Sequence, residues 1–307
     1  MAVEMTGSAI VHRGIAGRLS RQKLAMAAAV VLGFMLSCAV LAPQIEAAFG
    51  IDPDTVNLFA RLQAPDAAHP LGTDELGRDL LARLLEGGRV SLAVGLSGAL
   101  LAAVIGTFIG LVAGFFGGVA DAVLMRLTDA VLALPLLPLL IVLAAIDPRK
   151  IGLGGDLLTG ETASVYRIVV IVALFGWTTV ARLVRGAALS LRRRDFVRAA
   201  RALGAGPWRI MFVHVLPSIA SPIIVAASLS IGNIILTESV LSFLGLGIQP
   251  PLASWGGMLT NAQELIWQAP HLAWYPGLLI FVAVIAFNLM GDGLQRALDP
   301  RATPAGS

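Results

Sequence analysis

One uncharged stretch limits the fold of this chain more than any other feature. From Val90 through Ala120 the sequence contains no Asp, Glu, Lys or Arg. A helix that crosses a bilayer needs about 20 mostly apolar residues, and this stretch is longer than that. Small residues also recur at every fourth position within it, at Gly98, Ala102, Gly106, Gly110 and Gly114. Such a ridge lets helices approach closely in lipid, so we expect a membrane-spanning helix that packs tightly against a neighbour.

The composition extends this expectation to the whole chain. Of 307 residues, 57% are hydrophobic and 13% are charged, whereas a soluble domain has about 25% charged residues. We therefore expect an all-α, polytopic membrane protein. The single Cys38 excludes an internal disulfide, and the four histidines are too scattered to predict a metal site. Basic residues cluster at predicted membrane boundaries rather than among aromatics, which argues against a nucleic-acid partner.

Apolar runs predict six transmembrane helices. The first covers residues 24–42. It is longer than the roughly 7–15-residue apolar core of a signal peptide, so we expect an uncleaved helix. The second is the stretch described above, and the others cover about 121–146, 164–185, 218–244 and 272–294. Pro135 and Pro138 should kink the third helix.

The segments between these helices differ in character. Residues 43–89 form an outer loop, and we expect an amphipathic helix over 73–85, capped by Thr73 or Asp74. Residues 147–167 are polar and glycine-rich, and a tolerated loop is favoured over a contact site for a partner. Residues 245–271 carry no charge except Glu264 and suggest a re-entrant or interfacial excursion. At the start of the sixth span, three aromatic residues are expected to form a belt at the membrane interface: Trp267, Trp274 and Tyr275.

The distribution of Lys and Arg predicts the orientation. With both termini in the cytoplasm, the inner segments hold fifteen basic residues and the outer segments seven, as the positive-inside rule favours. The chain then divides into a cytoplasmic segment 1–23, the first helix 24–42, an outer loop 43–89, a core 90–295 and a cytoplasmic tail 296–307. The core contains helices two to six and a cytoplasmic loop at 192–217.

That loop has the pattern of two short helices joined by a sharp turn. Asp195 is a suitable N-cap for the first helix, and Gly204 stands where a left-handed residue would end it. Pro207 suits the first turn of the second helix, and Pro217 is expected to stop that helix before the fifth span.

The first of these helices is small on one face and basic at its edges. Ala199 and Ala200 form helix readily and have little bulk, and arginines flank them. Small residues permit deep insertion into a groove, and arginines permit pairing with carboxylates. A loop that is basic only because of its topology would explain the arginines but not the helix–glycine–helix layout.

The segment resembles the EAA loop of bacterial ABC importer permeases, in which Glu-Ala-Ala is followed by Gly and then by Ile-x-Leu-Pro. The matching residues are Ala199, Ala200, Gly204, Leu216 and Pro217. His214 occupies the Ile position, and Arg198 replaces the Glu, which weakens a capping box with Asp195. The resemblance implies that Asp195 to Pro217 is a coupling helix that rests in a cleft of a separate ATPase subunit.

Further motifs are similar to those of the dipeptide, oligopeptide and nickel branch of these permeases. They lie at residues 69–79 (HPLGTDELGRD), 88–92 (GRVSL), 238–247 (ESVLSFLGLG) and 254–256 (SWG), with Pro250 between the last two. The resemblance implies a type I ABC importer permease in the bacterial inner membrane. It also implies a second homologous permease, two ATP-binding subunits that hold ATP and Mg, and a periplasmic substrate-binding protein. Small peptides are the expected substrate, with nickel chelates, glutathione or another small solute as alternatives.

Polar residues inside the predicted spans are candidates for the translocation pathway. Glu238 and Asn233 lie within the fifth span, where polar side chains usually face the bundle or a water path. A carboxylate that binds a neighbouring helix near the outer interface explains Glu238 equally well. Arg126 and Asp129, one turn apart in the third span, are expected to pair structurally.

A secondary transporter and an intramembrane protease are the two competing classes of function. The chain is not an ATPase, because its only lysines, Lys23 and Lys150, do not follow a glycine as a P-loop requires. A stand-alone secondary transporter would often show internal repeats, and none is visible. An intramembrane protease would need Ser97 and His271 to meet, although both are placed toward the outer surface. Copurification of an ATPase would separate the importer from the secondary transporter, and a proteolytic activity abolished by Ser97→Ala would support the protease.

Overall fold

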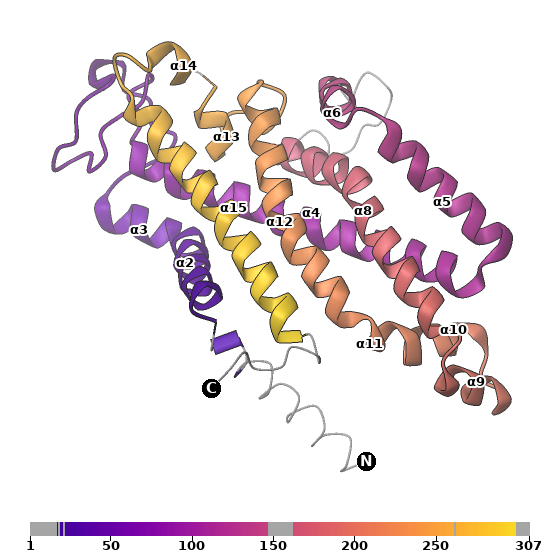
Figure 1. Ribbon diagram of the computed structural model, residues 1–307. Helices are drawn as coiled ribbons and strands as arrows, with labels where there is room; N and C mark the ends of the chain where they lie inside the picture. The colour runs from indigo at the N-terminus through magenta and orange to yellow at the C-terminus, as the bar shows by residue number, and fades with distance from the viewer. Residues whose placement is uncertain (1–16, 18, 21, 147–161, 261, 299–307) are drawn as a thin grey trace.

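The protein is a bundle of long helices, described here from a computed structural model that covers residues 17, 19–20, 22–146, 162–260 and 262–298 (Figure 1). Five helices are long and apolar enough to cross a membrane, and a sixth candidate is a bent pair. The described part contains one isolated β-bridge, between Thr73 and Asp79, and no longer strand. The five long helices are α2 (Lys23–Val40), α4 (Leu80–Phe116), α8 (Ala163–Leu191), α12 (Ala220–Phe243) and α15 (His271–Leu298). These findings confirm the predicted all-α polytopic fold.

The third predicted span is broken rather than kinked. It consists of α5 (Gly118–Ala133) and α6 (Leu136–Ala145), whose axes differ by 86°. Leu134 is extended (ψ 138°), the conformation that a following proline imposes. Pro138 lies in the first turn of α6, where the absence of an N–H leaves the helix intact. Pro135 therefore breaks the span, and Pro138 does not bend it.

The helix α4 begins well before the uncharged stretch. Its N-cap is Asp79, whose carboxylate accepts a hydrogen bond from the Ala82 N–H at 2.9 Å. The predicted amphipathic helix over 73–85, capped by Thr73 or Asp74, is therefore wrong. Gly72 and Gly77 adopt positive φ angles of 81° and 73°, which a regular right-handed helix does not allow, so the segment before Asp79 folds as a loop.

From Ala102 to Gly114 the small-residue ridge of α4 lies against α8, whereas Gly98 faces Ile234 of α12. The helices α4 and α8 form the most extensive pair among the described helices. A Cβ added at Gly106 or Gly114 would lie about 2.5 Å from a backbone carbonyl oxygen of α8, that of Trp177 or Arg185 respectively. Gly110 meets the carbonyl of Ala181 in the same way. The predicted close packing is confirmed, because no larger side chain fits along this seam.

Polar pairs also join α5 to α8. Arg182 donates a hydrogen bond to Asp129 at 2.6 Å, and Arg185 forms a bidentate pair with Asp121. The predicted pair of Arg126 with Asp129 is wrong, since Asp129 reaches the neighbouring helix instead.

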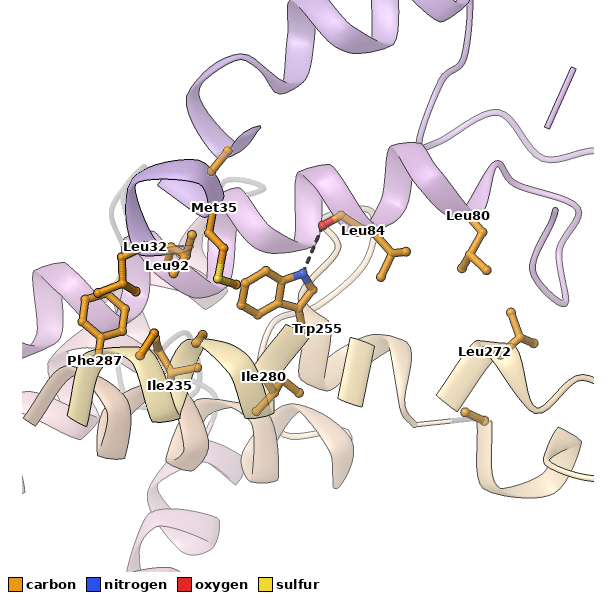
Figure 2. Packing of buried hydrophobic residues seen from close by; sticks show 14 of the residues in the cluster. Leu32, Met35, Leu80, Leu84, Leu92, Ile235, Trp255, Leu272, Ile280 and Phe287 are labelled. Carbon is orange, nitrogen blue, oxygen red and sulfur yellow. Dashed lines mark hydrogen bonds between the residues drawn. The ribbon is translucent and has the colours of Figure 1, made fainter. Parts of the chain in front are cut away.

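The predicted excursion over 245–271 folds back onto the long helices α4, α12 and α15. It contains α13 (Trp255–Met258) and α14 (Ala262–Leu265). Trp255 is 2% exposed, and its ring N–H donates to the carbonyl of Leu84 at 3.0 Å. Figure 2 shows this ring among apolar side chains from several helices. Trp267 and Trp274 are 94% and 71% exposed, as the predicted interfacial belt requires.

The first and last long helices meet where the described chain begins and ends. Arg296 donates a hydrogen bond to Gln22 at 3.0 Å, and Gly293 lies directly against Ala25. The beginning of α2 and the end of α15 thus lie on one side of the bundle, as an even number of spans requires. Which side faces the cytoplasm stays a prediction. A short helix, α3 (Ala42–Phe49), follows α2 after a bend at Leu41, and residues 147–161 of the predicted glycine-rich loop lie outside the described residues.

Candidate coupling loop and translocation groove

The first helix of the predicted coupling loop is α9 (Asp195–Ala202), and its start differs from the prediction. Arg194 is the N-cap residue, and Asp195 is the first helical residue. The Asp195 carboxylate does not cap a backbone N–H and instead pairs with Arg198, one turn along the helix. A cation at this position attracts the carboxylate away from the helix terminus, so the replacement of Glu by Arg198 changes the local structure as well as the charge.

The turn after α9 is a Schellman motif. Gly204 has φ +82°, its N–H donates to the Arg201 carbonyl at 2.9 Å, and the Ala205 N–H donates to the Ala200 carbonyl at 3.0 Å. This pair of hydrogen bonds around a left-handed glycine ends a helix sharply. The predicted role of Gly204 as the left-handed residue that ends this helix is confirmed.

The second helical segment runs without a gap into a wider turn. It comprises α10 (Pro207–Arg209), a π-helical segment (Ile210–Val215) and α11 (Leu216–Ser218). Pro207 is at the predicted first turn. Pro217, however, lies inside α11, and the helical path breaks two residues later at Ile219 (φ −111°). Because Pro217 has no N–H to bond within the helix, the preceding turn widens to π geometry, and the predicted stop at Pro217 is replaced by this bulge.

The loop is packed onto the end of α4. Val197 and Ala200 are buried in a cluster with Ile210 and Met211 and with Phe115 of α4. Arg201 lies over the Phe115 ring at 5.4 Å, and the rings of Trp208 and Phe212 stack with their centroids 6.1 Å apart. Ala200 therefore faces its own chain, whereas Ala199 and Gly204 are exposed. Of the predicted small face, Ala199 and Gly204 are therefore the residues that a partner can contact.

A groove lined by apolar side chains and several hydroxyl and amide groups follows α12 away from this loop. Two cavities, of about 370 and 730 Å³, both include Asn233, Ser230 and Thr179 in their walls. Asn233 is exposed on this face. The sequence predicts this residue as a pathway candidate because it is polar and lies inside the fifth span. The side chains that line the two cavities include no Asp, Glu, Lys or Arg. Their hydroxyl and amide groups are those of Thr178, Thr179, Ser218, Ser221, Ser230, Asn233, Thr237 and Gln295.

The sequence contained a signal for this groove that the prediction did not use. Ser230, Asn233 and Thr237 are three and four residues apart, the spacing that places side chains on one face of a helix. Thr179 belongs to α8, and only the packing of α8 beside α12 brings it to the same groove.

Comparisons with known proteins agree with this architecture. A family model described as the binding-protein-dependent transport system inner membrane component matches residues 106–304. This match includes the coupling loop, the groove and most of the described helices. The chain belongs to this family of permeases. A second model, the N-terminal TM domain of oligopeptide transport permease C, matches residues 13–65.

Relatives of this permease cover most of its length. The glutathione transport system permease protein GsiD of Pectobacterium atrosepticum is 42% identical over 287 residues, which is 92% of this chain and 89% of the relative. The dipeptide transport system permease protein DppC of Alkalihalophilus pseudofirmus is 38% identical over 92% of this chain and 88% of its own. The di/tripeptide transport system permease protein DppC of Pseudomonas aeruginosa is 44% identical over 78% and 75%. The family and the apolar helices together place the permease in the inner membrane as a multi-pass protein.

Glu238 of the permease lies outside the groove. It is fully buried and accepts hydrogen bonds from Ser242 at 2.6 Å and from Ser91 of α4 at 3.1 Å. The Ser91 hydroxyl oxygen in turn accepts a hydrogen bond from the backbone N–H of Trp255 at 3.2 Å. Glu238 thus joins α4, α12 and α13, and the structural alternative for this carboxylate fits better than the predicted pathway role.

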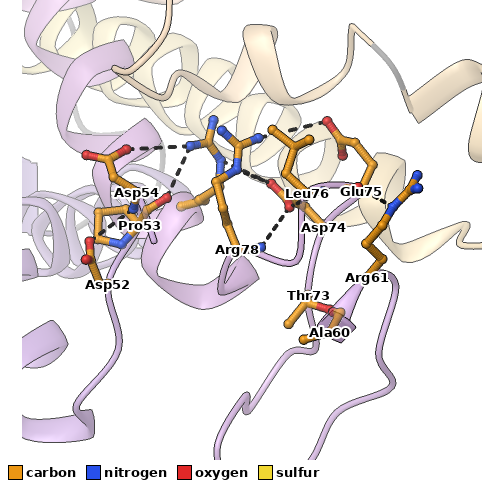
Figure 3. Close-up of polar contacts among 11 residues, drawn as sticks. Asp52, Pro53, Asp54, Ala60, Arg61, Thr73, Asp74, Glu75, Leu76 and Arg78 are labelled. Carbon is orange, nitrogen blue, oxygen red and sulfur yellow. Dashed lines mark hydrogen bonds and ion pairs between the residues drawn. The ribbon is translucent and has the colours of Figure 1, made fainter. Parts of the chain in front are cut away.

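The outer-loop motif at residues 69–79 forms a compact polar cluster before α4 (Figure 3). Asp74 is its centre: the carboxylate accepts backbone N–H groups from Leu76 and Arg78 and the Arg78 guanidinium at 2.7 Å. Arg83 of α4 reaches the carbonyl of Pro53 at 3.3 Å and so ties the loop to the helix. The cluster explains the motif as a scaffold that fixes the start of α4.

Two acidic groups elsewhere in the outer region have shifted pKa values. The Asp54 N–H and the Thr55 hydroxyl lower the pKa of Asp52, so Asp52 is charged at neutral pH. Partial burial, reinforced by the negative charge of Glu86, raises the pKa of Glu46. Near α3, the Asp52 carboxyl therefore ionises more readily than an ordinary aspartate, and the Glu46 carboxyl ionises less readily than an ordinary glutamate.

Proposed function

We propose that this permease is one of two membrane subunits of an ATP-driven importer. In this proposal the loop from Asp195 to Pro217 docks on an ATPase, and the groove along α12 forms half of the passage. A second, homologous permease completes the passage, two ATP-binding subunits hold ATP and Mg, and a periplasmic binding protein delivers the substrate. Both chain termini and the coupling loop lie in the cytoplasm.

One observation carries this proposal. The docking loop and the groove belong to one nearly continuous helical path, from Pro207 through the π-helical segment to Phe243, interrupted only at Ile219. A displacement of the loop by a partner therefore reaches Asn233 along a rigid element rather than through a flexible linker. Such a connection is what alternating access driven from the cytoplasm requires.

Small peptides are the proposed substrate. The relatives with dipeptide and di/tripeptide names support this choice, and the relative named for glutathione supports a peptide-like solute more generally. The amides of Asn233 and Gln295 in the groove suit the N–H and C=O groups of a peptide, since an amide both donates and accepts hydrogen bonds. The hydroxyls of Ser230 and Thr237 donate to carbonyls of their own helix and can accept a hydrogen bond from a peptide N–H. Nickel chelates and other small solutes are the alternative within the same machinery.

Copurification tests the importer against a secondary transporter. The permease, expressed with the neighbouring transport genes and purified in mild detergent, should retain both ATPase subunits, and uptake of a labelled dipeptide should require ATP. Uptake that needs only an ion gradient, with no ATPase retained, would contradict the proposal. The protease alternative has no structural support, because the Ser97 hydroxyl donates to the Ala93 carbonyl at 2.6 Å within its own helix.

Asn233→Ala tests the groove. The variant should assemble normally and lower dipeptide uptake about tenfold, the effect of losing roughly 1.4 kcal/mol of interaction with the passing solute. Ser228→Ala is the matched control, since Ser228 lies on the same helix but lines a different, apolar groove. Equal uptake by both variants would remove Asn233 from the passage.

A further inference from the structure

The docking loop exposes several large apolar side chains, and Leu203 at its tip is the most exposed of them. Leu203 is 88% exposed, and it immediately precedes Gly204, whose left-handed conformation fixes the turn. Ala199 and Ala202 are exposed beside it. In Figure 1, α9 lies beyond the ends of α4, α5 and α8, at the extremity of the molecule. A large apolar side chain held in that position has nothing in its own chain to cover it.

A ring of positive charge surrounds this tip. The loop from 192 to 217 contains six arginines and one acidic residue, Asp195, and that aspartate pairs with Arg198. The exposed arginines are Arg193, Arg194, Arg198, Arg201 and Arg209. A surface of this charge is complementary to a carboxylate-bearing partner and repels a basic one.

The tip is also rigid, which favours a protein partner over lipid. Val197 and Ala200 are buried beneath it, Arg201 lies over Phe115, and the Schellman hydrogen bonds close the turn. Segments that insert into a membrane surface carry a continuous apolar face, whereas Leu203 stands between Ala202 and Gly204, and the nearby large side chains of Phe196 and Trp208 are only 42% and 50% exposed. A preformed shape loses little conformational entropy on docking.

We propose that Leu203 is a knob that enters an apolar pocket of the partner ATPase, and that carboxylates at the rim of this pocket pair with the surrounding arginines. The inference rests on the proposed function and specifies the partner's chemistry. In particular, Arg198 is exposed on the docking helix, and in this proposal the ATPase residue opposite it is acidic. The arrangement makes the permease selective for ATPases with such a pocket.

The test uses the whole complex in nanodiscs, with ATPase retention measured at low and high salt. Leu203→Asp should weaken retention about tenfold or more at every salt concentration. Arg198→Glu should weaken it at low salt, and high salt should reduce the difference from wild type, since salt screens exposed charges. The matched controls are Phe59→Asp, an apolar-to-Asp change, and Arg61→Glu, both at exposed positions before α4. Both control variants should retain ATPase as wild type does.

The outcomes separate this inference from the proposed function. If the wild-type permease retains no ATPase, the proposed function fails. If ATPase is retained and neither Leu203→Asp nor Arg198→Glu weakens it, the importer stands and the knob and its acidic rim are refuted. If retention depends on anionic lipid in the disc rather than on Leu203, the tip binds the membrane and the inference is likewise overturned.

Discussion

Glu238 illustrates two explanations for a carboxylate within a membrane-spanning helix. Depth alone suggested a pathway residue, but the hydrogen bonds from Ser91 and Ser242 and the complete burial of the side chain assign it to helix association. The sequence could not distinguish these, because the partner Ser91 is 147 residues away. Asn233 is five residues earlier on the same helix and faces the groove instead.

Substitution of Glu238 tests this assignment. Glu238→Ala should lower the free energy of unfolding by about 2–4 kcal/mol, because two buried hydroxyls lose their acceptor, while Glu238→Gln keeps an acceptor oxygen and should cost less. The measurement is the fraction that remains monodisperse on size-exclusion chromatography after heating. An alanine variant with wild-type heat stability but altered substrate preference would return Glu238 to the pathway.

At the scale of elements, the sequence predicted helices better than their ends. The long apolar runs became α2, α4, α8, α12 and α15 because burial in lipid leaves helix as the only way for them to satisfy their backbone. The early start of α4 depended on the Asp79 cap and on the loop folded around Asp74, which no apolar pattern reveals. Pro135 predicted a bend, but the angle of 86° between α5 and α6 depends on the packing of α6 against α8, which the sequence does not reveal.

The seam between α4 and α8 makes a prediction at this scale. Gly110→Ala should destabilise the protein by about 1–3 kcal/mol, because its new methyl group meets the backbone carbonyl of Ala181 and the Cβ of Val184. Gly33→Ala is the matched control: nothing lies within 4 Å of that position on α2, so relief of glycine's backbone entropy should leave it neutral or stabilised by about 0.5–1 kcal/mol. Thermal inactivation of the two purified variants compares them, and equal loss in both would mean that the seam is looser than described.

At the scale of the whole molecule, the proposed docking loop at one end is connected to the groove along α12. The buried cluster of Val197, Ile210 and Met211 fixes the loop to α4, and the helical path from Pro207 onward leads into α12. The sequence motifs pointed to the loop and to its family, and they did not reveal the π-helical segment that joins it to the groove. That segment exists because Pro217 removes a backbone donor from an otherwise continuous helix.

The most direct test of the account is the number of dipeptides imported per ATP hydrolysed by the complete transporter in proteoliposomes. Pro217→Leu restores the backbone donor, favours a regular helix and changes how the loop is aimed relative to α12. Gly204→Trp alters the docking turn itself, and Pro43→Leu at the start of α3 serves as the control. We predict that Pro217→Leu keeps its ATPases and hydrolyses ATP but imports at least about tenfold fewer dipeptides per ATP. Gly204→Trp should show the same loss in the fraction that retains ATPase, while the control matches wild type. A wild-type ratio in both variants would contradict the claim that this loop couples hydrolysis to transport.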